Sequence, residues 1–379
     1  MTKTQLIRDA VTKLTERANR EIDQGLLPSC QFALGLDNQV VAQVTLGDHL
    51  GDDSRYAIFS ATKGLVYGAI FQLLGEGKLD LDQTISSVIP EFVGQGKDKV
   101  TVAQVMTHCG GFPLAPMAPE LWHDRQLRLD RMGEWRLTHE PGTFAYHATA
   151  AHWVLAELIE QVDGIDFQTA FRNRIIEPLG LKRTQLGVPL ADAHDINLAV
   201  PVGEPATAEE FQAALGISGI DPGEVTEDGA IASAQPEYLT AGLPGGGGVS
   251  TAGDLALYYQ GLLHNSGGVW DAEWLHRCTQ DVCVDAFDLL FVAPANRTLG
   301  MVVAGSDGYA GARGFGKTNS ARTFGYNGYG GQIAWADPDT GLSFSYLTNG
   351  IDRHLLRQTR RGVGISSLAA LCAEPLVTA

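Results

Sequence analysis

Positive charge is scarce in this chain of 379 residues: 27 Lys and Arg stand against 44 Asp and Glu, for a formal net charge of −17. Phosphate contacts need clustered Lys and Arg, so this balance argues against a nucleic-acid partner or an anionic membrane surface. Long apolar runs are also missing, and we expect no membrane-spanning helix. The segment Met1–Leu27 lacks the apolar centre of a secretory signal, so we expect a cytoplasmic protein.

Cysteine is rare as well, and its five copies are scattered through the chain without the spacing of a zinc site. We therefore expect free thiols in a reducing compartment. The Gly-x-Ser-x-Gly motif of α/β-hydrolases is absent, which excludes that route to an esterase. We expect neither a metal nor another cofactor.

Strand and helix patterns divide the chain into ends and middle. Residues 29–36 and 40–46 read as strands joined by a turn at Asp37-Asn38, and three more strand patterns fall after residue 298. Between about residues 79 and 239 the pattern is mostly helical. It predicts a short helix at residues 100–106 capped by Thr101 or a neighbour, an irregular loop from Gly110 to Trp135, and a helix at residues 167–176 that ends before Pro178. A final helix is expected at residues 361–372. We therefore predict an α/β (α+β) fold in which an antiparallel sheet is flanked by helices.

The two ends are expected to form one domain. Residues 1–78 and 243–379 would build the sheet domain, and residues 79–242 an inserted helical domain, with the active site in the cleft between them. Within the insertion, residues 191–240 are acidic and weakly patterned, which predicts a surface segment that could act as a lid.

One stretch carries the strongest chemical signal. Ser60 stands at a predicted strand-to-helix junction, and Lys63 follows three residues later on the same helical face. The helix N-terminus favours an oxyanion near Ser60, and burial with this field would lower the pKa of Lys63 toward that of a useful base. By itself the pair also fits a capping serine followed by a solvated lysine.

Further motifs follow in a set order, and with them the chain resembles the serine beta-lactamase and penicillin-recognising family, most closely its class C beta-lactamase and family VIII carboxylesterase branch. The segments that carry the resemblance are Ser60–Lys63, Val105–Phe112, Glu140–Tyr146, Ile176–Leu181, Gly246–Leu255, Phe324–Gly331 and Asp337–Asn349. Together they cover nearly the whole chain, and the resemblance implies a beta-lactamase-like fold.

The resemblance implies roles for single residues. Ser60 would be the nucleophile and Lys63 its base or proton relay, while Tyr146 would share the proton and pass it to the leaving group. The backbone N–H groups of Ser60 and Tyr329 would form the oxyanion hole.

Two positions depart from the family pattern. Its Tyr-x-Asn motif becomes Tyr146-His147-Ala148, and Ala148 has no amide to bond the side chain of a beta-lactam or peptide. The Lys or His that opens the third motif becomes Tyr326, a neutral phenol that binds a carboxylate less well. His147 could replace the missing donor, although a surface histidine is the simpler interpretation.

The residues expected to face a substrate are Tyr326, Asn327, Gly328, His147 and Trp122. For Trp122, a pocket wall and simple core filling are equally compatible with the sequence. His108 lies in a turn motif and is expected to be structural.

These observations favour a serine carboxylesterase that forms an acyl-enzyme on Ser60 and acts on small-molecule esters or amides, with uncharged esters preferred. A beta-lactamase, a D-amino-acid peptidase or amidase, and an acyltransferase are the alternatives of the same fold. A non-catalytic binding protein is the alternative of another class. Gly311–Thr318 also matches the P-loop pattern, but no helical periodicity follows it, so a nucleotide site is not expected.

Overall fold

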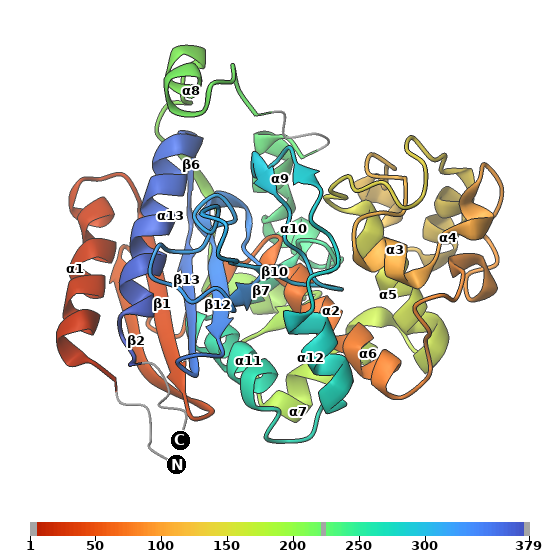
Figure 1. Ribbon diagram of the computed structural model, residues 1–379, viewed down its shortest axis with the longest axis horizontal. Coiled ribbons are helices and arrows are strands. Elements are labelled where there is room, and N and C mark those ends of the chain that lie inside the picture. Colours follow the sequence, from red (N-terminus) through yellow and green to blue (C-terminus); the bar gives the residue numbers. More distant parts are fainter. Residues whose placement is uncertain (1–5, 221–224, 375–379) are drawn as a thin grey trace.

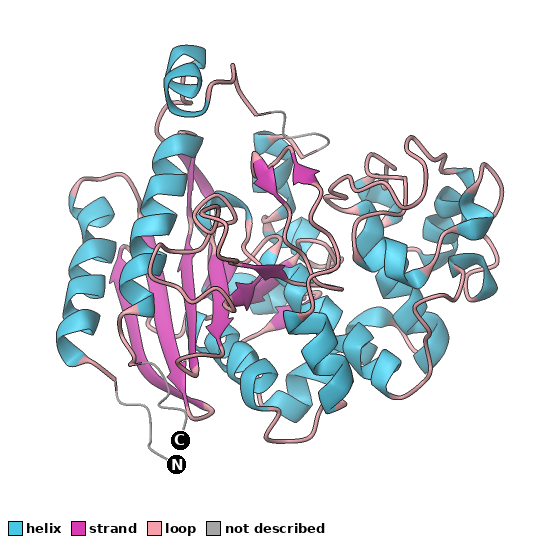
Figure 2. Cartoon of the chain, in the orientation of Figure 1, coloured by secondary structure: helices cyan, strands magenta, loops and turns pink. Residues whose placement is uncertain are grey.

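The computed structural model describes residues 6–220 and 225–374. A six-stranded antiparallel sheet occupies one side of the molecule, and a group of helices occupies the other (Figures 1 and 2). The strands, in spatial order, are β10 (Val302–Val303), β11 (Phe324–Gly325), β12 (Ile333–Asp337), β13 (Leu342–Thr348), β1 (Ser29–Leu36) and β2 (Gln39–Gly47).

The sheet joins the two ends of the chain. In its centre β1 pairs with β13, with Phe32 opposite Tyr346. The predicted hairpin between β1 and β2 is confirmed, since Asp37 and Asn38 both have positive φ, 50° and 62°. Two left-handed residues in a two-residue loop match the twist of the strands, and Asp and Asn tolerate this conformation better than other residues.

Helices cover both faces of this sheet (Figure 1). On one face α1 (Arg8–Asp23) and α13 (Leu355–Ala370) pack over β1, β12 and β13, and on the other face lies α11 (Ala252–His264). Every residue of β1 is therefore buried, because its alternating side chains enter two different cores. The last helix begins at Leu355, six residues earlier than the sequence pattern at residues 361–372 predicted.

The helix that follows Ser60 is α2 (Ala61–Gly75), and it runs through the interior. Its residues from Ala61 to Leu74 are all buried, because it packs against α5 (Ala150–Asp163) and α12 (Ala272–Gln280) as well as the tyrosines of α11. A helix that is apolar all round belongs inside a protein. Lys63 is its one charged residue.

The other helices are shorter. They are α3 (Val102–Met106), α4 (Arg125–Glu134), α6 (Phe167–Phe171), α7 (Glu177–Leu179), α8 (Ala208–Leu215), α9 (Glu227–Ser233) and α10 (Pro236–Leu239). The first three of these gather with α5 on the side away from the sheet (Figure 1). None of the helices among the described residues is both long and apolar enough to cross a membrane.

Two helical predictions need correction. The region up to Trp135, expected to be a loop, contains α4, which Asp124 caps through a bond from the Leu127 N–H. The helix at residues 167–176 was expected to end before Pro178. It continues through a wide turn at Arg172–Ile176 into α7. Pro178 has no N–H for the carbonyl of Arg174 four residues earlier, and Gln72 Nε2 donates to this carbonyl instead, at 2.8 Å.

The end of the predicted insertion pairs with strands of both flanking segments. A four-stranded sheet has the order β4 (Gln185–Leu186), β7 (Gly248–Ser250), β3 (Arg55–Ala57) and β5 (Ile196–Asn197), and β6 (Val200–Val202) pairs with β14 (Gly350–Asp352). A further pair joins β8 (Phe287–Asp288) to β9 (Ala293–Pro294). The domain boundaries at residues 79 and 242 stay a prediction, as does a lid at residues 191–240, of which 221–224 lie outside the described residues.

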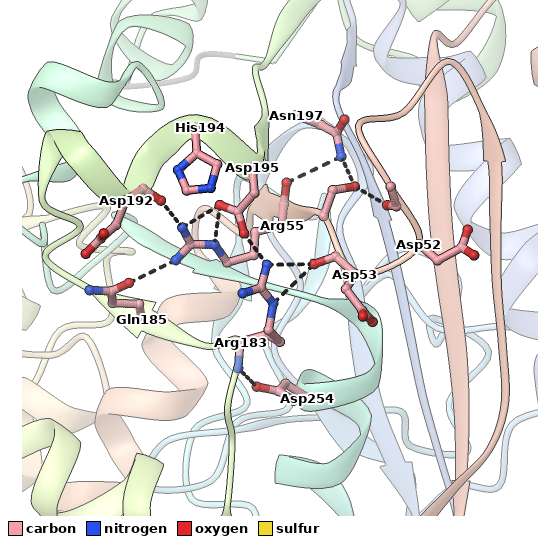
Figure 3. Close-up of polar contacts among 12 residues, drawn as sticks. Asp52, Asp53, Arg55, Arg183, Gln185, Asp192, His194, Asp195, Asn197 and Asp254 are labelled. Carbon is pink, nitrogen blue, oxygen red and sulfur yellow. Dashed lines mark hydrogen bonds and ion pairs between the residues drawn. The ribbon is translucent and has the colours of Figure 1, made fainter.

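An ion-pair network anchors β3, the strand that leads to Ser60 (Figure 3). The Arg55 guanidinium donates to Asp195 through Nε at 3.0 Å and to Gln185 through Nη1 at 2.9 Å, and Nη2 reaches the Asp192 carbonyl. Arg183 binds the other oxygen of Asp195. Because these partners lie on the segment after α7, the network holds that segment against β3.

Candidate active site

Ser60 lies at the N-terminus of α2, directly after a residue with a strained backbone. Phe59 has φ +44°, which is uncommon for a bulky side chain. The Ile58 N–H donates to the Gly248 carbonyl at 3.0 Å, so β7 holds the turn from β3 into α2. Strain of this kind persists where the surrounding structure enforces it, and here it presents Ser60 at the end of a buried helix.

Lys63 lies one turn after Ser60 and faces it. Its Nζ is 2.9 Å from Ser60 Oγ and 2.5 Å from the Gly245 carbonyl oxygen. The side chain is fully buried. The structure therefore forms the Ser–Lys contact that the three-residue spacing predicted.

Tyr146 completes this group. Its hydroxyl hydrogen-bonds to Ser60, and Lys63 Nζ lies 5.6 Å from the centre of its ring. Burial alone would raise the pKa of the phenol, but the positive charges of Lys63 and Arg297 and the bonds from Ser60 and Tyr326 outweigh burial. The pKa of Tyr146 is therefore below its ordinary value.

The turn that contains Tyr329 lies against the residues before Ser60. A Cβ atom on Gly328 would come within 2.2 Å of the Ile58 carbonyl oxygen, so only glycine permits this approach. The rings of Phe59 and Tyr329 meet edge to face, with centroids 6.0 Å apart. These contacts hold the turn at residues 328–329 against residues 58–59. The oxyanion hole formed by the N–H groups of Ser60 and Tyr329 stays a prediction.

Two of the expected substrate-facing residues make internal bonds instead. The Asn327 amide donates to the Gly314 carbonyl at 2.9 Å and accepts the Ala334 N–H at 3.1 Å. Tyr326 is only 3 % exposed, and its hydroxyl contacts His108 Nε2 at 3.1 Å and Arg297 Nη1 at 3.4 Å. Tyr326 thus faces the interior behind Tyr146.

His147 is buried, so the interpretation as a surface histidine is wrong. Its Nδ1 donates to the Ala145 carbonyl at 2.6 Å, and its Nε2 accepts the Phe112 N–H at 3.2 Å. Burial lowers the pKa of His147 to about 4, against a smaller opposite effect of the Ala145 carbonyl. Because main-chain groups occupy both ring nitrogens, neither is available to a substrate.

Trp122 lies at a different place from the Ser60 group. It is buried, donates from Nε1 to the Met117 carbonyl at 2.8 Å and packs on Trp153. It lines a cavity of about 490 Å³ whose other walls include Trp153, Glu157, Glu160, Phe167 and Gly242. Ser60, Lys63 and Tyr146 are not among the lining residues of this cavity.

Arg297 is a buried charged residue beside Tyr146 that motif reasoning missed. It is 2 % exposed, forms an ion pair with Asp288 at 3.3 Å and lies 5.3 Å from the centre of the Tyr146 ring. No motif covers it. The available signal was the scarcity of charge in residues 286–304, where Asp288 and Arg297 are the only charged residues.

The P-loop-like stretch does not form a phosphate cradle. In the described chain, bends follow Lys317 where a P-loop would begin a helix. The Lys317 N–H donates to Ser367 Oγ at 2.8 Å, and a Cβ atom on Gly316 would collide with the Ser367 main chain. This loop therefore packs on α13. Among the described residues, no group of three or more His, Cys, Asp or Glu has the arrangement of a metal site.

Comparisons with known proteins identify the family and the fold of this chain. A profile of the family described as Beta-lactamase matches residues 7–363. The chain is 30 % identical over 358 residues to the esterase/beta-lactamase LipL of Mycobacterium tuberculosis, covering 89 % of this chain and 81 % of LipL.

Solved structures share the fold. A penicillin-binding protein homologue from Caulobacter crescentus superposes with a TM-score of 0.78 at 25 % identity, over 98 % of this chain and all of the homologue. A family VIII carboxylesterase gives a TM-score of 0.76 at 20 % identity, over 97 % of this chain and all of that protein. The predicted beta-lactamase-like fold is confirmed. The chain belongs to the Beta-lactamase family and is a serine hydrolase of the beta-lactamase and penicillin-binding-protein superfamily.

Proposed function

We propose that this protein is a carboxylesterase that hydrolyses small, uncharged esters through an acyl-enzyme on Ser60. The observation that carries the proposal is the contact of Lys63 Nζ with Ser60 Oγ at 2.9 Å, beside a half-buried Tyr146 whose pKa is lowered. A serine hydroxyl becomes a nucleophile when an adjacent base takes its proton.

In the first half of the reaction, Ser60 Oγ attacks the ester carbonyl carbon while its proton passes to Tyr146, with Lys63 orienting both groups. The oxyanion is bonded by the N–H groups of Ser60 and Tyr329. Tyr146 then returns the proton to the alkoxide leaving group, and the C–O bond to the alcohol breaks. In the second half, water attacks the acyl carbon, Ser60 recovers its proton and the acid is released.

The preference for uncharged esters rests on what surrounds the Ser60 group. Ala148 offers no side-chain hydrogen bond where relatives carry an amide, and the Tyr326 hydroxyl is engaged with His108 and Arg297. These features do not favour a carboxylate or an acylamino group in the substrate. The esterase activity in the name of LipL supports the same choice.

The free thiols of all five cysteines favour a reducing, cytoplasmic location.

The test measures release of nitrophenol from a short p-nitrophenyl ester, together with the intact mass of the protein during turnover. The native protein should release nitrophenol and show a transient acyl adduct that is absent from Ser60→Ala. Ser87→Ala is the matched control, because Ser87 is an exposed serine whose Oγ only bonds the Thr84 carbonyl. It should retain native turnover.

A penicillin tested in parallel separates the alternatives. A long-lived penicilloyl adduct without ester turnover would replace the esterase proposal with penicillin recognition. No adduct from either reagent would favour a non-catalytic binding protein. Ester turnover by Ser60→Ala equal to that of the native protein would refute the acyl-enzyme on Ser60.

A further inference from the structure

We propose that the buried residues Arg297 and Tyr326 form a relay that stabilises negative charge on Tyr146. Arg297 supplies a positive field and Tyr326 a hydrogen bond, and together they keep Tyr146 ready to accept the Ser60 proton. In the resembled family a lysine or histidine opens the third motif, whereas here a neutral phenol stands at that position. The inference rests on the proposed function, because it names two positioning residues of the same site. The hydrogen bonds around Tyr326 fix which atoms donate and which accept.

Arg297 is a cation held mainly by aromatic rings. Its guanidinium carbon lies 5.3 to 5.8 Å from the centres of four of them, which belong to Tyr146, Phe291, Tyr326 and Phe144. Within the described residues, Asp288 is the only carboxylate paired with it, and Arg297 Nε is buried without a hydrogen-bond partner. A guanidinium does not lose its proton in proteins, so its positive field acts permanently on the two phenols.

His108 supplies the second donor to Tyr326. Its Nδ1 accepts the His147 N–H at 3.2 Å, which requires that the proton of the neutral ring be on Nε2. Burial is the largest of the effects that lower the pKa of His108, so the ring stays neutral. The Nε2–H group, 3.1 Å from Tyr326 Oη, must therefore be a donor to that oxygen.

The Tyr326 hydroxyl thus receives hydrogens from His108 and from Arg297 Nη1. Its own hydrogen has to go to a third group, and Tyr146 is the side chain with which it forms a further hydrogen bond. Burial and the neighbouring Tyr146 raise the pKa of Tyr326 well above its ordinary value, despite the opposite effect of Arg297. The proton therefore stays on Tyr326, and the negative charge develops on Tyr146.

Once ionised, Tyr146 accepts one hydrogen from Tyr326 and one from Ser60. As Ser60 Oγ bonds to the ester carbonyl carbon, the serine proton moves to the Tyr146 oxygen. Arg297 and Tyr326 touch neither substrate nor Ser60 in this step, so they act by holding the charge on Tyr146.

The test is the pH dependence of kcat/KM for ester hydrolysis. The acidic limb of this profile is the pH range in which kcat/KM falls as the pH decreases. In Arg297→Met and in Tyr326→Phe it should move to higher pH by about one pH unit, since an adjacent cation or donor lowers the pKa of an acid by that order. At pH values below the acidic limb of the native protein, kcat/KM of these variants should be about tenfold lower than that of the native protein. At alkaline pH the plateau of kcat/KM should be largely retained. Tyr326→Phe is nearly isosteric, so it tests the relay if Arg297→Met does not fold.

Asp288→Asn should act in the opposite direction, because it removes the negative charge that partly cancels Arg297. Its acidic limb should move to lower pH. Arg313→Met is the matched control: Arg313 is equally buried and pairs with Asp307, and no contact links it to Tyr146. That variant should lose stability without moving the limb.

The proposed relay is wrong if the acidic limb of kcat/KM lies at the native pH in both Arg297→Met and Tyr326→Phe. It is also wrong if Asp288→Asn moves this limb to higher pH. A readout without turnover separates this failure from failure of the esterase proposal. The ultraviolet titration of tyrosinate, native minus Tyr146→Phe, should show one tyrosine that ionises below pH 10 and ionises at higher pH in Arg297→Met. That result can be obtained even from a protein that hydrolyses no ester.

Discussion

Two buried arginines of this protein have opposite surroundings. Every nitrogen of the Arg55 guanidinium donates to an oxygen of Asp195, Gln185 or Asp192 (Figure 3). Among residues 6–220 and 225–374, Arg297 has one ion pair at 3.3 Å, one hydrogen bond of 3.4 Å, a nitrogen without a partner and a shell of aromatic rings.

The difference follows from what each charge does. Buried polar groups are normally fully bonded, and an arginine that meets this condition neutralises its own field within the network. Arg55 therefore holds segments together. At Arg297 the bonds are too few and too long to cancel the charge, so its field reaches the two tyrosines and can alter their protonation. A buried charge with incomplete bonding marks a functional site better than burial alone.

Lys63→Met should give the largest effect. Removing the ammonium beside Ser60 should slow acyl-enzyme formation by a factor of about 10³, the range of a lost general base or relay. The free energy of unfolding should not fall, because methionine fills similar space in a helix that is otherwise apolar. Quenched intact-mass measurements and urea unfolding of the same variant check both statements. A large loss of stability with a normal acylation rate would mean that Lys63, like Arg55, holds segments of the protein together and does not take part in acylation.

Arg55→Met should show the reverse pattern. It leaves Asp195 with Arg183 alone, and breaking a buried ion pair costs about 3 kcal/mol of unfolding free energy. Turnover per folded molecule and the acidic limb of kcat/KM should be unchanged. Urea unfolding followed by ester assays in the folded range makes the comparison. A shift of the acidic limb in Arg55→Met would mean that Arg55, like Arg297, affects the ionisation that controls kcat/KM.

The stability lost in Arg55→Met should itself depend on pH. Although burial raises the pKa of Asp195, bonds to Arg55 and Arg183 lower it below its ordinary value. A carboxylate with a lowered folded-state pKa stabilises the protein above its unfolded pKa, and this contribution is lost as the pH falls through the folded value. The difference between native and Arg55→Met should therefore shrink only below about pH 4.

His147 should give the smallest effect, and in a different pH range. Its pKa is lowered from 6.5 to about 4, so the unfolded chain binds a proton that the folded protein excludes. This stability is present above pH 6.5 and is lost as the pH falls toward 4. The difference in free energy of unfolding between the native protein and His147→Gln should decrease by about 2 kcal/mol as the pH falls from 6.5 to 5. Urea unfolding at several pH values measures this, and a constant difference would contradict it.

The parts of the molecule that were predicted correctly depend on local patterns. The Asp37-Asn38 hairpin, the helix from Ser60 and the cap of α3 by Thr101 each follow from a few neighbouring residues. The set Ser60, Lys63 and Tyr146 could be named because each stands in a motif of fixed spacing, although their roles stay predictions until the variants are measured.

The errors share a cause. The segment before Trp135 was predicted as a loop because α4 contains five charged residues in ten and buries little of its surface. His147 was assigned to the surface because a single histidine in a sequence carries no mark of burial. Only the contacts with Phe112 and Ala145, one of them 35 residues away, decide its environment.

The sequence by itself determined the family, the order of strands and helices, and the three candidate catalytic side chains, because these depend on spacing along the chain. Only the tertiary structure decided that Tyr326 turns inward to Tyr146 and that Arg297 lies behind both. Arg297 and Tyr326 are 29 residues apart, and Tyr146 comes from the helical side of the molecule. Burial and the distance between charges, which set a pKa, arise when such segments pack together, and a linear pattern does not contain them.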